Sequence, residues 1–255
     1  MFSAAMDKEP YLSVIIPIYN EVPNFRRGSL NRVHSYLASQ PFSWEIILVN
    51  DGSTDGTLSL LQNFSATHPH TRVLDNPHQG KAASVMAGVF ASAGQIILFT
   101  DTDQATPITE FDKFREAFTR GFDLAVGSRS GRPGAPVFRQ ILAYGMIIVR
   151  TLILRLPVRD TQCGFKAFTS QAGRKIFTAF SLVHPARPIS GPAVNPGFDV
   201  EILYLARKMG FKIAEVPVLW THQETKRVRF FHDAVSGLKE LLLIRYRSLT
   251  HVYRY

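Results

Sequence analysis

The stretch Gln95-Ile96-Ile97-Leu98-Phe99-Thr100-Asp101-Thr102-Asp103 decides the fold of this chain. Its apolar part has the composition of a buried strand, and two carboxylates one residue apart follow directly. An isolated Asp-x-Asp is usually a solvated turn or a helix N-cap. At the carboxyl end of a strand, however, hard oxygen ligands can hold Mg²⁺ or Mn²⁺ against the phosphates of a ligand. The stretch therefore indicates a buried strand that ends in a candidate metal site.

A second acidic turn has the same position relative to a strand. The apolar run at residues 45–49 is followed by Asn50-Asp51-Gly52-Ser53-Thr54-Asp55-Gly56-Thr57. Further strands are predicted at residues 12–17, 71–74 and 124–127, and helical patterns at 29–39, 56–64, 80–93 and 111–120. Because strands alternate with helices, the class is α/β with a doubly wound, mostly parallel sheet. Ligands of such sheets bind outside the carboxyl ends of the strands, where both acidic turns fall.

The second half of the chain is less regular. An apolar segment at residues 141–156 is interrupted by Arg150 and Arg155. The sequence then predicts a polar turn feeding a strand at 160–168, an irregular loop at 182–197, a helix at 197–210, a strand at 214–218 and a final helix at 230–249. Pro217 assigns the last strand to an edge of the sheet, because proline donates no ladder hydrogen bond.

Composition limits the classes of function. The chain has 255 residues, a net charge of +9 and a single cysteine, Cys163. One cysteine allows no intrachain disulfide, which fits a reducing compartment. No apolar stretch reaches the ~18–20 residues of a spanning helix. A basic chain could bind nucleic acid, but no aromatic–basic motif of a known RNA or DNA fold is present, so we expect no nucleic-acid partner.

Four motifs in order carry a family resemblance: residues 17–21 (Pro-Ile-Tyr-Asn-Glu), 49–55 (Val-Asn-Asp-Gly-Ser-Thr-Asp), 80–82 (Gly-Lys-Ala) and 101–103 (Asp-Thr-Asp). This set resembles the family 2 inverting glycosyltransferases, which have the GT-A fold. Residues 160–166, 198–201 and 215–221 resemble the polyprenyl-phosphate branch, above all the dolichyl-phosphate β-glucosyltransferases. The resemblance implies one domain over residues 1–255, with a nucleotide-sugar half at about 11–127 and an acceptor half at about 128–255. It also implies hexose transfer, from UDP-glucose, to a polyprenyl or dolichyl phosphate.

The resemblance assigns donor-binding roles. Asp51 is expected to accept a hydrogen bond from uracil; its alternative is an N-cap for the following helix. Pro17, Tyr19 and Glu21 are expected to wall the nucleoside. Lys81 opens a helix and could bind the diphosphate, or be a solvated lysine.

The Asp-x-Asp motif is expected to hold Mg²⁺ or Mn²⁺. Asp103 is predicted to ligate the metal directly, whereas Asp101 contacts the ribose or the metal shell. Thr102 lies between them in the donor site. Gln104 or Gln162 could complete the metal shell.

For a lipid-phosphate acceptor, the enzyme needs cationic side chains that bind the phosphate rather than a base that removes a proton. The second ionisation of a phosphomonoester lies near pH ~6, so a lipid phosphate is already a nucleophile. Arg129 and Arg139 flank a Gly/Pro-rich loop and suit phosphate binding, or are a solvated basic loop. Asp160 resembles a carboxylate assigned as base in this branch, and it could instead order the acceptor loop.

The apolar segment at 141–156 has two interpretations, a core helix or an interfacial helix whose arginines reach outward. The basic C-terminal helix allows the same membrane contact, or a dimer contact. We therefore expect a peripheral protein at the cytoplasmic face of a membrane. Three alternatives stay open: another donor such as GDP-mannose, a soluble or polysaccharide acceptor, and a non-catalytic nucleotide-sugar binder.

Overall fold

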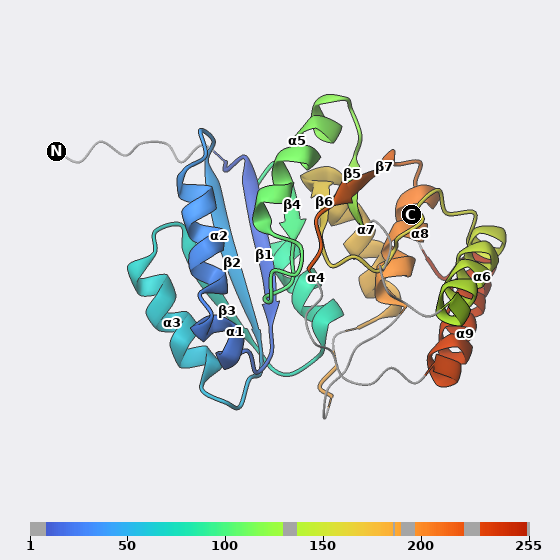
Figure 1. Cartoon of the computed structure of the whole chain (residues 1–255), viewed down its shortest axis with the longest axis horizontal. Helices are drawn as coiled ribbons and strands as arrows, with labels where there is room; N and C mark the ends of the chain where they lie inside the picture. The colour runs from blue at the N-terminus through green and yellow to red at the C-terminus, as the bar shows by residue number, and fades with distance from the viewer. Residues whose placement is uncertain (1–8, 130–136, 186, 190–196, 222–229, 254–255) are drawn as a thin grey trace.

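The computed structural model describes residues 9–129, 137–185, 187–189, 197–221 and 230–253. One seven-stranded sheet runs through both halves of the described chain in the order β3-β2-β1-β4-β6-β5-β7 (Figure 1). Its strands are β1 (Leu12–Ile18), β2 (Trp44–Asp51), β3 (Thr71–Asn76), β4 (Ile96–Phe99), β5 (Leu124–Arg129), β6 (Lys166–Thr169) and β7 (Ile213–Val218). Only β6 runs antiparallel to its neighbours, so the predicted mostly parallel sheet is confirmed.

Helices cover both faces of this sheet. They are α1 (Val22–Arg26), α2 (Ser29–Ala38), α3 (Thr57–Thr67), α4 (Lys81–Ala91), α5 (Phe111–Thr119), α6 (Val137–Leu154), α7 (Ser170–Val183), α8 (Phe198–Lys208) and α9 (Phe230–Leu249). Alternate strand residues feed two cores, because successive side chains point to opposite faces. Ile15 and Phe99 pack with α4, α7 and α8, whereas Val14 and Leu98 pack with α2, α3 and α5.

One long helix has no counterpart in the sequence predictions. Helix α7 follows β6 directly, and the Thr169 hydroxyl caps it by accepting from the Ala172 amide at 3.3 Å. It extends to Val183 and so replaces the first two residues of the loop predicted at 182–197. The buried spacing of Ala172, Ile176 and Phe180 is helical and was the signal that could have located it. The predicted edge position of the proline-containing strand β7 is confirmed.

In the interfacial-helix interpretation, Arg150 and Arg155 were both expected to reach outward, and for Arg150 this is wrong. Its side chain is buried, and its guanidinium donates to the Thr161 hydroxyl and to the carbonyls of Val158 and Arg159 at 2.7–2.8 Å. A buried ion needs partners for its donors, and here three oxygens accept from Nη1 and Nη2, while the buried Nε has no partner among the described residues. Arg150 therefore fastens α6 to the loop before β6, whereas Arg155 is exposed as expected.

Candidate active site

The carboxyl ends of three parallel strands bring the predicted donor motifs together. β1 pairs with β2 and with β4 in parallel, so the loops after all three strands share one edge of the sheet. The Thr102 hydroxyl donates to the Pro17 carbonyl at 3.0 Å, which ties the Asp-x-Asp loop to the end of β1. The Asn20 amide donates to the Ser53 hydroxyl at 3.0 Å and ties β1 to the second acidic turn. The expected juxtaposition of these motifs is thus present.

Asp51 holds the turn that leads into α4. Its carboxylate accepts from the backbone amides of Gln79 and Gly80 at 2.8 and 2.9 Å, and from His78 Nδ1 at 2.8 Å. The alternative in which Asp51 caps the following helix is wrong, because α3 starts after Gly56 without a contact to it. The His78 ring stacks on Tyr19 with centroids 4.0 Å apart. Asp51 and Tyr19 therefore belong to one cluster at the ends of β1 and β2.

Glu21 lies just before helix α1, after the end of β1. Its amide donates to the Thr57 hydroxyl at 3.0 Å, and its carboxylate accepts from the Asn24 side chain at 2.6 Å. Burial raises the pKa of Glu21. The Asn24 hydrogen bond lowers this pKa in part, and the nearby charges of Asp103 and Asp101 raise it again. The charge of Glu21 is thus felt by the Asp-x-Asp motif, and its place in the nucleoside wall stays a prediction.

The two aspartates of the motif line one pocket of about 100 Å³. Lys81 Nζ contacts Asp101 Oδ1 at 2.5 Å, and Asp103 Oδ1 accepts from the Ala105 amide at 3.0 Å. Burial raises the pKa of Asp103, and the charge of Asp101 adds to this. The pocket is lined by Thr100, Asp101, Asp103, Ala105, Thr106, Arg129, Gln162, Gly164 and Trp220.

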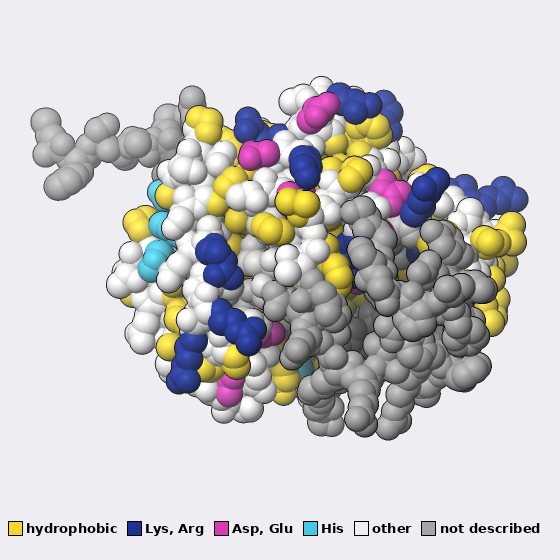
Figure 2. Space-filling model, in the orientation of Figure 1, with side chains coloured by type: hydrophobic (Ala, Val, Ile, Leu, Met, Phe, Trp, Pro, Cys, Tyr) yellow, Lys and Arg dark blue, Asp and Glu magenta, His cyan; other side chains and the backbone are white. Residues whose placement is uncertain are grey.

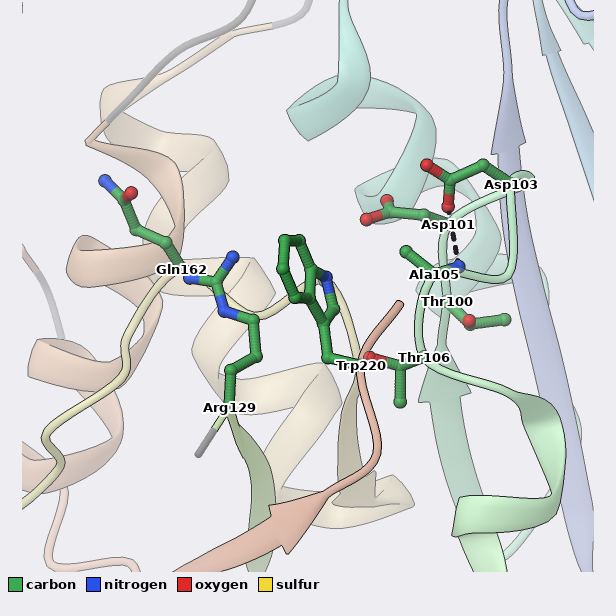
Figure 3. Close-up of a pocket in the computed structure, with 9 residues that line it drawn as sticks. Thr100, Asp101, Asp103, Ala105, Thr106, Arg129, Gln162 and Trp220 are labelled. Atoms are coloured by element: carbon green, nitrogen blue, oxygen red, sulfur yellow. Dashed lines mark hydrogen bonds between the residues drawn. The ribbon is translucent and has the colours of Figure 1, made fainter. Parts of the chain in front are cut away.

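Figure 3 shows how the pocket is arranged: Asp101 and Asp103 lie on one side, Arg129 and Gln162 on the other, and Trp220 between them. Negative charge from the end of β4 thus faces positive charge from the end of β5. Such a pocket can bind a cation on one wall and an anion on the other.

Arg129 and Asp160, both predicted catalytic residues, bind each other. Arg129 donates from Nε to Oδ2 of Asp160 at 2.6 Å and from Nη2 to Oδ1 at 2.9 Å, a bidentate pair. Burial would raise the pKa of Asp160, but the hydrogen bonds and charge of Arg129 hold it below its ordinary value. A carboxyl with a lowered pKa is a weak base, which favours the loop-ordering role over proton abstraction.

Arg129 also lies over the Trp220 ring, 5.5 Å from its centroid. The predicted partner Arg139 is in α6, and its side chain lies outside the part of the chain that the structure describes. Trp220, Thr106 and Gly164 line the pocket without having been assigned a role from sequence. Trp220 and Gly164 belong to the motifs at 215–221 and 160–166, which indicated only the family. Nothing in the sequence showed that these two residues would line the pocket.

The carboxylates fit a hard divalent cation. No cluster of three or more His, Cys, Asp or Glu side chains that could hold a metal occurs among the described residues. Mg²⁺ typically takes one or two carboxylates and completes its shell with water and substrate phosphates, which matches Asp101 and Asp103. The Gln104 amide nitrogen donates to the Asp101 carbonyl at 2.8 Å, while its buried Oε1 has no partner among the described residues. The assignment of Gln104 to the metal shell stays a prediction.

Sequence comparison defines the class of protein. Residues 13–177 match the model of Glycosyl transferase family 2, and the chain belongs to this family. The fold agrees: glucosyl-3-phosphoglycerate synthase from Mycobacterium tuberculosis, solved in complex with Mn²⁺, UDP-glucose and phosphoglyceric acid, is similar with a TM-score of 0.61 and 20% identity. The likeness covers 92% of this chain and 79% of that one, and the predicted GT-A fold is confirmed.

Particular relatives lie within the branch that the motifs indicate. The dolichyl-phosphate beta-glucosyltransferase of Dictyostelium discoideum is 32% identical over 96% of this chain and 76% of its own length. The enzyme of the same name from Drosophila melanogaster is 33% identical over 95% of this chain and 77% of its own length.

Proposed function

We propose that this glycosyltransferase moves glucose from UDP-glucose to dolichyl phosphate or a related polyprenyl phosphate, with inversion at the sugar. The observation that carries the proposal is a pocket whose one wall is the Asp-x-Asp motif and whose other wall is Arg129. Relatives named as dolichyl-phosphate beta-glucosyltransferases align over nearly the whole chain and support the choice of sugar and acceptor. The nucleotide-sugar half is about 11–127 and the acceptor half about 128–255.

Asp101 and Asp103 would hold Mg²⁺ or Mn²⁺ together with the donor diphosphate. When bound, such an ion neutralises charge that develops on the departing nucleoside diphosphate. Lys81 opens α4 beside Asp101, so its ammonium and the helix N-terminus add positive charge on the same side. Asp51, Tyr19, Pro17 and Glu21 would bind the nucleoside at the ends of β1 and β2.

Arg129 would bind the acceptor phosphate opposite the aspartates. In the reaction a phosphate oxygen attacks the anomeric carbon, a new C–O bond forms there, and the bond to the diphosphate breaks. Since a phosphomonoester is largely ionised near neutral pH, no side chain has to remove a proton. Asp160 then serves to keep the Arg129 fork in place, and Trp220 packs against the guanidinium. Arg139 is the second proposed acceptor cation.

The acceptor is a lipid, so a membrane surface is the proposed partner. Helices α6 and α9 pack side by side at one edge of the molecule (Figure 1). Figure 2 shows hydrophobic side chains, in yellow, at this right-hand edge of the molecule. The large apolar side chains exposed on the two helices are Ile148, Leu152, Leu238, Leu242, Leu243, Tyr246 and Leu249. We call this set the apolar edge. Lys239 and Arg245 are exposed on helix α9 and can reach anionic headgroups.

Within the described part of the chain, no helix has the length and hydropathy needed to cross a bilayer. Cys163, the single cysteine, is consistent with the cytoplasmic face, which stays a proposal.

A donor and acceptor panel tests the reaction. Purified protein is incubated with UDP-glucose, UDP-N-acetylglucosamine or GDP-mannose, with Mn²⁺ and either a short polyprenyl phosphate or phosphoglycerate as acceptor, and the product is identified by mass. We expect glucosyl polyprenyl phosphate as the product, and we expect it only with UDP-glucose as the donor. Transfer from GDP-mannose would change the donor, and transfer to phosphoglycerate but not to lipid would move the protein to a soluble acceptor.

Flotation with anionic liposomes tests the membrane contact. Ile148 and Leu152 are 59% and 73% exposed, so replacing both by Ser should leave the fold intact and release the protein from the liposomes. Phe90→Ser is the matched control, because Phe90 is 42% exposed on α4, away from the apolar edge, and should not affect binding. Equal binding by the Ile148→Ser, Leu152→Ser protein would contradict the assignment of this edge.

A further inference from the structure

Among the described residues that line the pocket, Trp220 is the one aromatic side chain. It lies two residues after the end of β7 and is half-buried. Figure 3 shows its indole between Asp101 on one side and Arg129 on the other. A group that enters the space between the two charged walls must therefore meet this ring.

The backbone around Trp220 is fixed to the segment that follows the Asp-x-Asp motif. The Leu219 amide donates to Oε2 of Glu110 at 3.1 Å, and Glu110 is itself buried. The Thr221 amide donates to the Ala105 carbonyl at 2.8 Å. These two hydrogen bonds hold the chain directly before and directly after Trp220, so the fold sets the position of the indole relative to the motif.

The opposite wall holds the same ring through Arg129. β5 and β7 pair in parallel, with Arg129 in register with Val218, so Arg129 and Trp220 come from neighbouring strand ends. The guanidinium lies 5.5 Å from the centroid of the indole ring, and its bidentate contact with Asp160 keeps it there. A ring that is held on both sides before the substrate arrives loses little conformational freedom on binding.

The proposed reaction determines which group lies between the walls. During transfer the anomeric carbon lies between the departing diphosphate oxygen and the attacking phosphate oxygen, and the three atoms must be aligned. The diphosphate is assigned to Asp101 and Asp103, and the acceptor phosphate to Arg129. The sugar ring then occupies the space between these residues, which is where Trp220 lies.

We propose that Trp220 binds the transferred sugar, with the glucose ring of the donor packed against its indole. The inference rests on the proposed function, since it uses both phosphate assignments. The ring hydroxyls of glucose are equatorial, so both faces of the sugar present C–H groups. These groups are apolar and slightly positive, whereas the face of an aromatic ring is apolar and negative. Packing the two together holds the anomeric carbon in line with both oxygens.

Calorimetric titrations with UDP-glucose and with UDP test the proposal, both with Mn²⁺ and without lipid. The Kd for UDP-glucose should rise about 3–10-fold in Trp220→Ala, the contribution of one aromatic contact. UDP lacks the sugar, so its Kd should change by less than about twofold in the same variant. Trp220→Phe should recover most of the lost affinity for UDP-glucose, because a phenyl ring keeps the aromatic face.

Other roles of Trp220 predict different results. If the indole only supports the fold of the pocket, UDP and UDP-glucose lose affinity by the same factor. If it only holds Arg129 in place, the Kd for UDP-glucose stays unchanged and the KM for polyprenyl phosphate rises. If the indole blocks the sugar instead, Trp220→Ala binds UDP-glucose more tightly than wild type does. Each of these results would overturn the proposal.

Fluorescence provides a second readout that leaves Trp220 intact and so keeps the test valid if Trp220→Ala does not fold. The chain has two tryptophans, and Trp44→Phe leaves Trp220 as the only one. Trp44 is the first residue of β2, at the opposite end of that strand from Asp51, and it packs on His34 and His70. Trp44→Phe should therefore keep the wild-type Kd values. Saturating UDP-glucose should change the Trp220 emission far more than saturating UDP does, and an equal response to the two ligands would contradict the proposal.

Glucose transfer is measured separately, so that this inference and the proposed function can fail independently. Protein that binds UDP-glucose with the expected effects at Trp220 but transfers no glucose to polyprenyl phosphate would refute the proposed function and leave the sugar contact standing. Glucose transfer by the wild type, together with an unchanged Kd for UDP-glucose in Trp220→Ala, would do the reverse. Wild-type protein that binds no UDP-glucose would overturn both.

Discussion

Replacing Gly164 by Ala would place a methyl group against Asp101. An added Cβ would lie 1.9 Å from Asp101 Oδ2 and 2.6 Å from its Cγ, whereas real Cβ atoms essentially never approach another atom within 3.0 Å. The carboxylate must therefore retreat by about 1.1 Å. Its side chain is 40% exposed and can move, so we expect a change in melting temperature of only a few degrees.

The catalytic cost follows from this displacement. Moving a positioning or ligating group by about 1 Å typically costs about 100-fold in rate, or about 2.7 kcal/mol of transition-state stabilisation. Gly164→Ala should thus lower kcat/KM for glucose transfer about 100-fold. It should also weaken Mn²⁺ binding, because the carboxylate no longer lies at its place beside Asp103.

Initial-rate assays with labelled UDP-glucose and a short polyprenyl phosphate measure the effect, and an Mn²⁺ titration provides a second readout. The matched control is Gly145→Ala on α6, where an added Cβ has no atom within 4 Å. In a helix this change should stabilise the protein by about 0.5–1 kcal/mol and leave the rate unchanged. Wild-type kcat/KM and Mn²⁺ affinity in Gly164→Ala would refute the reasoning that Asp101 must stay where Gly164 permits it.

Three further substitutions test the remaining assignments. Asp103→Asn should abolish transfer without lowering the melting temperature, because an amide is a poorer Mg²⁺ ligand; near-normal turnover at saturating metal would contradict this. Arg129→Ala should raise the KM for polyprenyl phosphate or lower kcat, at a cost of ~1.5–3 kcal/mol, whereas a loss of donor affinity would assign Arg129 to the diphosphate. The pKa of Asp160 is lowered in the folded protein by Arg129 against the effect of burial, so its contribution to stability should be present above about pH 4 and be lost as the pH falls through the lowered value. Urea unfolding of wild type and Asp160→Asn across pH 2–7 measures this, and a pH-independent difference would exclude it.

The alternation of strands with helices and the position of the motifs at strand ends could be predicted from sequence. The alternation of apolar runs with helical patterns is a local property, since each strand or helix shows its own period along the chain. In a parallel sheet the carboxyl ends of neighbouring strands meet, so the predicted strand ends already placed residues 17–21, Asp51 and Asp101 at one edge. Helix α7 was not predicted, although the spacing of Ala172, Ile176 and Phe180 is helical.

Pairing between distant charges was decided by the tertiary structure alone. Arg129 and Asp160 are 31 residues apart, and Lys166 and Asp199 are 33 apart, yet each pair is in direct contact. A sequence shows which side chains carry charge but not which of them share a buried space, because that depends on how β5, β6 and α8 pack. The same reason applies to Arg150. Its charge predicted an outward position, but its guanidinium is buried and donates to the carbonyls of Val158 and Arg159. The sequence by itself determined the class of sheet, the family and the edge where the candidate site lies, whereas packing decided which charged groups at that edge are in contact.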